Sequence, residues 1–144
     1  MEKDRQLLEE LLREEDELQF DAFTNDDALR LGLAMVERAR AGAMPLTVDV
    51  RRNGQQLFHC ALAGTSADND EWILRKARVV DRYGHSSLYV GAKYRARGTT
   101  FDAWSRLDLD RYAAHGGAFP IIVRDVGPVG TVAVSGLQIG RAHV

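Results

Sequence analysis

The chain has 144 residues, which is enough for one compact domain and too few for two ordinary ones. A composition that is 45% hydrophobic and 28% charged is typical of a globular protein and excludes global disorder. The net charge of −2 disfavours general nucleic-acid binding, and the single cysteine, Cys60, excludes an intramolecular disulfide. Because the sequence has no apolar run of membrane-spanning length and no signal peptide, we expect a cytoplasmic protein without nucleic-acid or membrane partners.

Charge is distributed unevenly along the chain. Residues 1–27 hold eleven acidic and three basic residues, whereas residues 28–144 hold ten acidic and sixteen basic ones. Leucines at helical spacing predict an acidic amphipathic helix over residues 3–17. Its acidic side is either a solvated face or a docking surface for basic groups, in the same chain, in a neighbouring subunit or in a protein partner.

A helix and a β-hairpin are predicted next. Thr24 is a suitable N-cap for a helix over residues 25–41, which is apolar on most sides and should be buried against a sheet. Residues 46–51 alternate in polarity, and Asn53-Gly54 predicts a two-residue turn into a strand over residues 55–62. Regular pairing from that turn places Val48 opposite His59. His59 would then lie among aliphatic side chains, with Asp49 on the other face, so that the two could not form a dyad.

The second half of the chain predicts helices over residues 69–83 and 88–97, a long connection over 99–117, and a hairpin of strands 119–125 and 129–135. The last strand looks central, which calls for a covering helix. Residues 139–144 do not supply one, and the back-translation of this tail resembles a sequencing-library adapter. We therefore expect a single domain over residues 1–138, a non-native tail over 139–144 and a missing C-terminal helix.

Four segments carry a family resemblance: VDVRRNGQQLFHCAL (48–62), DNDEWILRKARVVDRYGHSS (68–87), YAAHGGAFPIIV (112–123) and VGTVAVSG (129–136). They resemble a small uncharacterised family of the haem-degrading-domain superfamily, alongside HbpS-like and GlcG-like proteins. The resemblance implies an α/β (α+β) domain with a profilin-like antiparallel sheet, helices on both faces and assembly into homo-oligomers. It also implies haem or small-ligand binding and possible haem degradation, but it supplies no catalytic residue, so enzymatic activity is left open.

Haem binding requires an axial ligand such as imidazole beside an apolar slot, and cations for the propionates. His115 precedes two glycines that allow close approach of a ligand, which makes it the best candidate ligand. His59 is a second candidate, whose alternative interpretation is a buried histidine satisfied by one hydrogen bond. Arg75, Lys76 and Arg78 are candidate propionate partners, or else partners for acidic residues of a neighbouring subunit. The alternative function is that of a non-enzymatic homo-oligomeric adaptor.

Overall fold

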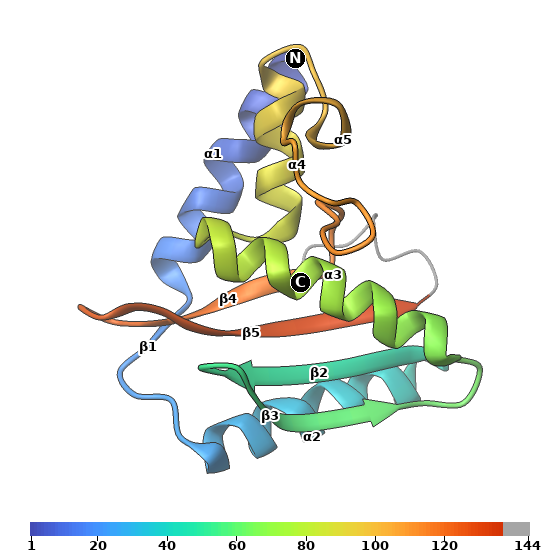
Figure 1. Ribbon diagram of the computed structural model, residues 1–144. Coiled ribbons are helices and arrows are strands. Elements are labelled where there is room, and N and C mark those ends of the chain that lie inside the picture. The colour runs from blue at the N-terminus through green and yellow to red at the C-terminus, as the bar shows by residue number, and fades with distance from the viewer. Residues whose placement is uncertain (137–144) are drawn as a thin grey trace.

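The computed structural model describes residues 1–136, which form five helices and five strands (Figure 1). The helices are α1 (Glu2–Glu17), α2 (Asn25–Ala41), α3 (Ala67–Tyr83), α4 (Ser87–Ala96) and α5 (Phe101–Trp104). The strands are β1 (Gln19–Phe20), β2 (Leu46–Arg52), β3 (Gln55–Ala61), β4 (Ala118–Val123) and β5 (Gly127–Gly136). The long connection predicted over residues 99–117 therefore contains one short helix, α5.

All five strands form one sheet in the order β1-β4-β5-β2-β3. The two predicted hairpins, β2–β3 and β4–β5, are joined in the middle by antiparallel pairing of β2 with β5. The short strand β1 pairs with β4 in the parallel direction at one edge, and sequence patterning did not predict it. The expected mixed α/β domain, with a largely antiparallel sheet, is thus confirmed.

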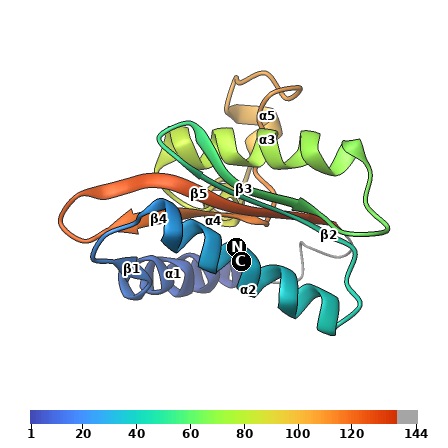
Figure 2. The ribbon, with the colours of Figure 1, turned by 90° about the horizontal axis from the view of Figure 1, so that it is seen from below.

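Helices cover both faces of the sheet, as expected. Helix α3 packs mainly on β5 and β4, whereas α2 packs on the other face against β2 and β3 (Figure 2). Helices α1 and α4 lie against each other beyond the edge formed by β1 and β4 (Figure 1). Helix α3 ends at Gly84, whose φ of 73° is a left-handed conformation that glycine adopts without strain.

Helix α1 is held by apolar packing and by acidic side chains that find partners in the same chain. Leu11 is buried in a cluster with residues of α3, α4 and α5. Glu15 Oε1 lies 2.7 Å from His85 Nδ1, and Asp4 Oδ1 accepts a hydrogen bond from Arg95 Nε at 3.1 Å. Part of the acidic segment therefore docks on basic groups within the chain, one of the arrangements that the charge pattern allowed.

Helix α2 begins and ends where its sequence indicated. The Thr24 hydroxyl accepts from the Asp27 backbone N–H, and the Asp27 carboxylate accepts from the Thr24 N–H, which completes a capping box. Helix α2 packs against the sheet as expected, but not all of its apolar residues are buried, since Leu29 and Leu33 are 48% and 54% exposed. Burial is confined to one side, where Gly32 lies directly against the Phe58 ring.

The first hairpin departs from regular pairing at a β-bulge. Arg51 pairs with Gln56, but the preceding residue Val50 pairs with Phe58, so Leu57 is an extra residue in β3. Each residue of β3 beyond the bulge therefore lies on the face opposite to the one that regular alternation predicts. Phe58 joins the apolar side that α2 covers, and the next side chain turns towards α3.

Two further expectations concern the C-terminal tail and membrane-spanning segments. The non-native tail expected over residues 139–144, and with it the missing C-terminal helix, lies outside residues 1–136. Within those residues, every helix falls short of the length and hydropathy needed to cross a membrane.

Candidate functional site

His115 lies in the segment between α5 and β4 and is exposed at the surface. Its ring packs edge-to-face on Trp72 of α3, with ring centroids 5.7 Å apart. A pocket of about 200 Å³ adjoins it, lined by Gly91, Arg95, Thr100, Phe101, Asp102, Ala114 and His115. Among residues 1–136, neither ring nitrogen of His115 has a hydrogen-bond partner, so an imidazole nitrogen is left for a ligand.

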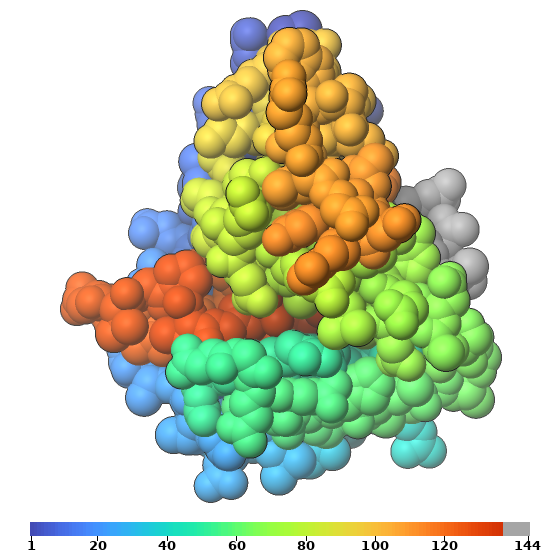
Figure 3. Space-filling view, viewed as in Figure 1, coloured from blue at the N-terminus to red at the C-terminus, as the bar shows by residue number. Residues whose placement is uncertain are grey.

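The segment carrying His115 is fixed to α3 by the basic residues that were candidate propionate partners. Arg75 Nη2 donates to the Leu109 carbonyl at 2.7 Å, and its guanidinium lies 4.3 Å from the centroid of the Trp72 ring. Arg78 Nη1 donates to the Arg111 carbonyl at 3.2 Å. Figure 3 shows this segment, in orange, lying over α3 and beside α4. Arg75 and His115 thus both contact the Trp72 ring.

Lys76 lies beneath this segment and is only 3% exposed. Its Nζ donates to the carbonyls of Gly116 and Val134, at 3.2 and 2.7 Å, so it joins the residue after His115 to β5. Burial lowers the pKa of Lys76 to about 8, because an apolar environment disfavours the charged ammonium. Lys76 lies three residues after Ile73 and four before Val80, both buried, and this helical spacing could have predicted its inward position.

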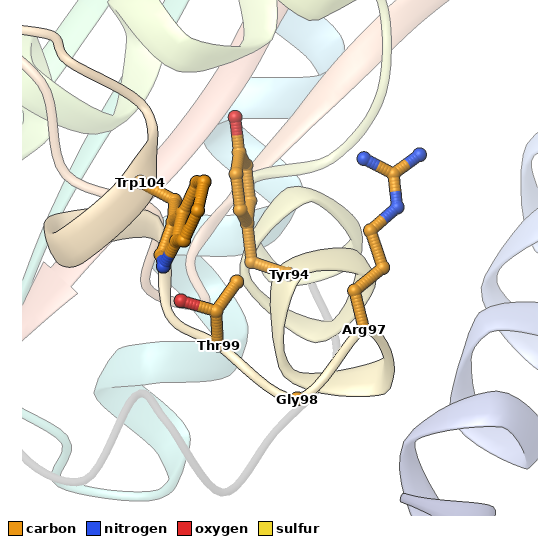
Figure 4. Close-up of a pocket in the computed structure, with 5 residues that line it drawn as sticks. All are labelled: Tyr94, Arg97, Gly98, Thr99 and Trp104. Atoms are coloured by element: carbon orange, nitrogen blue, oxygen red, sulfur yellow. The ribbon is translucent and has the colours of Figure 1, made fainter.

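A second and larger pocket, of about 490 Å³, lies at the end of α4 and is lined by Tyr94, Arg97, Gly98, Thr99 and Trp104 (Figure 4). The indole of Trp104 is 67% exposed beside the Tyr94 ring. The Tyr94 hydroxyl lies 3.5 Å from that of Tyr83, and burial, followed by this contact, raises the pKa of Tyr83 to about 12. An exposed indole and a half-buried phenol ring, in a pocket that a guanidinium also lines, suit a flat ligand that carries negative charge.

His59 lies in a separate cluster and contradicts the pairing inferred from the sequence. It pairs with Asp49 across the hairpin, and its Nδ1 lies 2.9 Å from Asp49 Oδ1, because the bulge at Leu57 brings both side chains to the face of α3. The His59 side chain is 31% exposed, and its Nε2 lies 3.0 Å from Asp70 Oδ1. The prediction of a buried His59 among aliphatic residues, unable to contact Asp49, is therefore wrong.

Asp49 itself is fully buried, and its carboxylate is the centre of this cluster. It accepts from Arg51 Nε at 2.7 Å and from Gln56 Nε2 at 2.6 Å, in addition to its contact with His59. Among residues 1–136, no group of three or more histidine, cysteine and acidic side chains has an arrangement that could hold a metal ion. Both nitrogens of His59 face carboxylate oxygens, whereas those of His115 do not, so the two candidate ligands differ in availability.

A five-stranded, largely antiparallel sheet with helices on both faces defines the class: a small α/β domain. The family of haem degrading proteins described as HbpS-like matches residues 23–142. The chain belongs to this HbpS-like family. A UPF0303 protein of Streptomyces coelicolor is 58% identical over 134 residues, which are 93% of this chain and 85% of that protein.

Solved structures give the same result for the fold. The crystal structure of the Ybr137w protein superposes with a TM-score of 0.84 at 34% identity, covering 94% of this chain and 80% of that one. A crystal structure of PduOC in complex with haem superposes with a TM-score of 0.68 at 20% identity, covering 82% and 85% of the two chains. At that identity the second likeness shows a shared fold only.

Proposed function

We propose that this chain is a haem-binding protein in which His115 ligates the iron. The observation that carries the proposal is the state of His115: an exposed imidazole, with no hydrogen bond from residues 1–136, over a pocket whose walls include Phe101 and Ala114. Haem iron is commonly held by a histidine nitrogen in an apolar setting. The family description and the haem complex of a protein with the same fold support the choice of ligand.

The residues around His115 fit haem in their chemistry. Trp72 packs edge-to-face on the imidazole, and the buried Gly116, whose carbonyl accepts from Lys76 Nζ, holds the backbone that follows His115. Arg95 lines the pocket and offers guanidinium N–H groups beyond the Nε that pairs with Asp4. The pocket of about 200 Å³ is smaller than the roughly 300–1,000 Å³ of sites that enclose drug-sized ligands, so it would take only one edge of haem and leave most of the porphyrin outside.

The chain's own residues would bind and orient the cofactor. His115 would hold the iron, and Arg75 would act indirectly, by stacking on Trp72 and holding the Leu109 carbonyl. Lys76 would position His115 through the carbonyl of Gly116. Bound haem supplies an iron centre for redox or oxygen chemistry. Haem degradation is a further proposal, since it needs O2 and electrons from outside this chain. The adaptor hypothesis and cytoplasmic localisation stay predictions.

Titration with haemin tests the binding proposal. We expect the wild type to shift the Soret band with saturation, and His115→Ala to weaken binding by at least about tenfold, because the iron loses its protein ligand. His59→Ala is the matched control, a histidine-to-alanine change in the separate cluster with Asp49, and should bind as the wild type does. Equal affinity of the wild type and His115→Ala would contradict the proposal. Adding ascorbate and O2 to the complex, and following loss of the Soret band, tests degradation separately.

A further inference from the structure

The pocket at the end of α4 is built on a turn that hydrogen bonds hold in place. The chain leaves α4 through Gly98, whose φ of 83° is left-handed. The Gly98 N–H donates to the Arg95 carbonyl at 2.9 Å, and the Thr99 N–H donates to the Tyr94 carbonyl at 3.2 Å. These two bonds form a Schellman motif, which ends the helix and redirects the chain towards α5 and Trp104. We call the pocket lined by Tyr94, Arg97, Gly98, Thr99 and Trp104 the α4–α5 pocket.

The two aromatic rings of the α4–α5 pocket differ in how closely the chain packs them. The Tyr94 ring is half-buried and packs edge-to-face on Phe101, with ring centroids 5.6 Å apart, and its hydroxyl lies 3.5 Å from that of Tyr83. The indole of Trp104 lies beside Tyr94, is 67% exposed and contacts no other ring within residues 1–136 (Figure 4). Tyr94 is thus a fixed wall, and Trp104 is a large apolar surface open to solvent. A flat ring stacked on the indole would bury that surface.

The charge at the α4–α5 pocket is positive. None of its five lining residues is acidic, and the exposed Arg97 extends its side chain alongside the Tyr94 ring (Figure 4). The Arg97 guanidinium forms no ion pair with residues 1–136. Basic residues also occupy the last turn of α4, where they offset the partial negative charge at the C-terminal end of the helix. Arg97 can therefore bind a carboxylate or a phosphate through charge-assisted hydrogen bonds.

We propose that the α4–α5 pocket binds a flat aromatic anion, with the ring of the ligand stacked on Trp104 and its carboxylate or phosphate held by Arg97. The volume of about 490 Å³ lies within the roughly 300–1,000 Å³ of small-molecule sites. The lining residues include no histidine, cysteine or methionine to hold a haem iron, so the ligand is an organic ring without a metal. The α4–α5 pocket shares no lining residue with the pocket beside His115, and the proposal does not depend on haem binding.

Isothermal titration calorimetry with matched pairs of probes tests the ligand class. Flavin mononucleotide and riboflavin share a flat ring system and differ in the phosphate, whereas 2-naphthoate and 2-naphthamide differ in the carboxylate. We expect at least one anion to bind at least about tenfold more tightly than its neutral counterpart, because only the anion can pair with Arg97. The pair that shows the difference identifies the preferred anionic group. If neither anion binds more tightly than its neutral counterpart, the proposal is overturned.

Variants of the two ligand-binding side chains test the assignment of residues. Trp104→Ala should weaken binding of the anion by at least about tenfold, and Trp104→Phe should restore part of it, because a ring remains for stacking. Arg97→Gln should lower the affinity for the anion to that for the neutral counterpart. Lys93→Gln is the matched control: it removes one positive charge from the same helix, but its Nζ lies over the Tyr89 ring, outside the pocket lining. Equal losses in Arg97→Gln and Lys93→Gln would contradict the role of Arg97.

Exchanging variants and ligands separates this site from the proposed haem site. His115→Ala should bind the anion as the wild type does, and Trp104→Ala should bind haemin as the wild type does. Both substituted residues are exposed, so both variants should retain the circular dichroism spectrum of the wild type. Competition of haemin with the anion in the wild type, together with loss of both ligands in Trp104→Ala, would overturn the proposal by showing that the α4–α5 pocket takes haem.

Discussion

The two faces of the sheet differ in the charged groups that they bury, although both have apolar clusters. On the face covered by α2, Val50 and Phe58 belong to an apolar cluster with Ala28 of the helix. On the face covered by α3, the fully buried Asp49 and the nearly buried Lys76 are surrounded by hydrogen-bond partners. Successive side chains of β2 point to opposite faces of the sheet. Val50 therefore lies on the α2 face, and its neighbour Asp49 lies on the α3 face.

The difference suggests that the two faces contribute differently: apolar burial on the α2 face stabilises the fold, and hydrogen bonds on the α3 face fix the positions of particular segments. Apolar packing is nondirectional, so the α2 face contributes burial and tolerates small adjustments. Hydrogen bonds to buried charges are directional and costly to break, so the α3 face fixes the hairpin register and the segment that carries His115. We therefore expect substitutions on the α3 face to cost more, and to depend on pH, whereas those on the α2 face should depend on volume.

Asp49→Ala is the strongest test of the α3 face. Removing the carboxylate leaves Arg51, Gln56 and His59 without their shared acceptor, and we expect a loss of about 3–4 kcal/mol in the free energy of unfolding. Urea denaturation followed by circular dichroism measures it. Asp70→Ala is the control on the other side of His59, and should cost less than about 1 kcal/mol because Asp70 is 44% exposed. Equal losses would show that burial of Asp49 does not matter.

Lys76 should make stability depend on pH. Its pKa is about 8 in the folded chain and near 10.5 when unfolded, so between these values the unfolded chain binds more protons. Stability should therefore rise as the pH increases from about 8 to 10.5, by about 2–3 kcal/mol, and should lack this contribution at lower pH. The measurement is urea denaturation across this range, with Lys76→Met subtracting the titration of all other groups. A wild type and variant with parallel pH profiles would refute it.

Gly32→Ala tests close packing on the α2 face, where we expect the smallest effect. A Cβ at residue 32 would lie within van der Waals overlap of the Phe58 ring, and the strain should exceed the helix-propensity gain of alanine, for a net loss of about 1–2 kcal/mol. Thermal unfolding measures this loss, and Phe58→Leu in the same chain should relieve part of it. Gly42→Ala is the control, since its nearest neighbours are 3.5 Å away. No recovery in the double variant would point to a cause other than the ring.

Local signals predicted most of the helices and strands. Thr24 and Gly42 bound α2 at the positions expected, and Asn53-Gly54 supports the turn between β2 and β3. The turn sequence did not predict the bulge at Leu57. The polarity pattern of β3 is compatible with pairing either with or without an inserted residue, so it does not distinguish the two registers. The two-residue strand β1 and the four-residue helix α5 are too short to show a period.

The candidate site was predictable in composition but not in arrangement. His115 was identified from the glycines that follow it, a local signal. Its contact with Trp72 joins residues far apart in the chain, and the use of Arg75 and Arg78 to hold backbone carbonyls depends on the path of residues 99–117. Sequence spacing carries no information on such a path, since an irregular connection has no repeat to extrapolate.

The packing of α1 on α4 has a consequence for synthesis on the ribosome. The apolar side of α1, centred on Leu11, is covered by residues that leave the ribosome only after a large part of the chain has been made. During that interval the leucines are unprotected, and the many acidic residues of the helix keep nascent chains apart by mutual repulsion. We therefore expect the acidic composition of α1 to oppose aggregation before folding is complete.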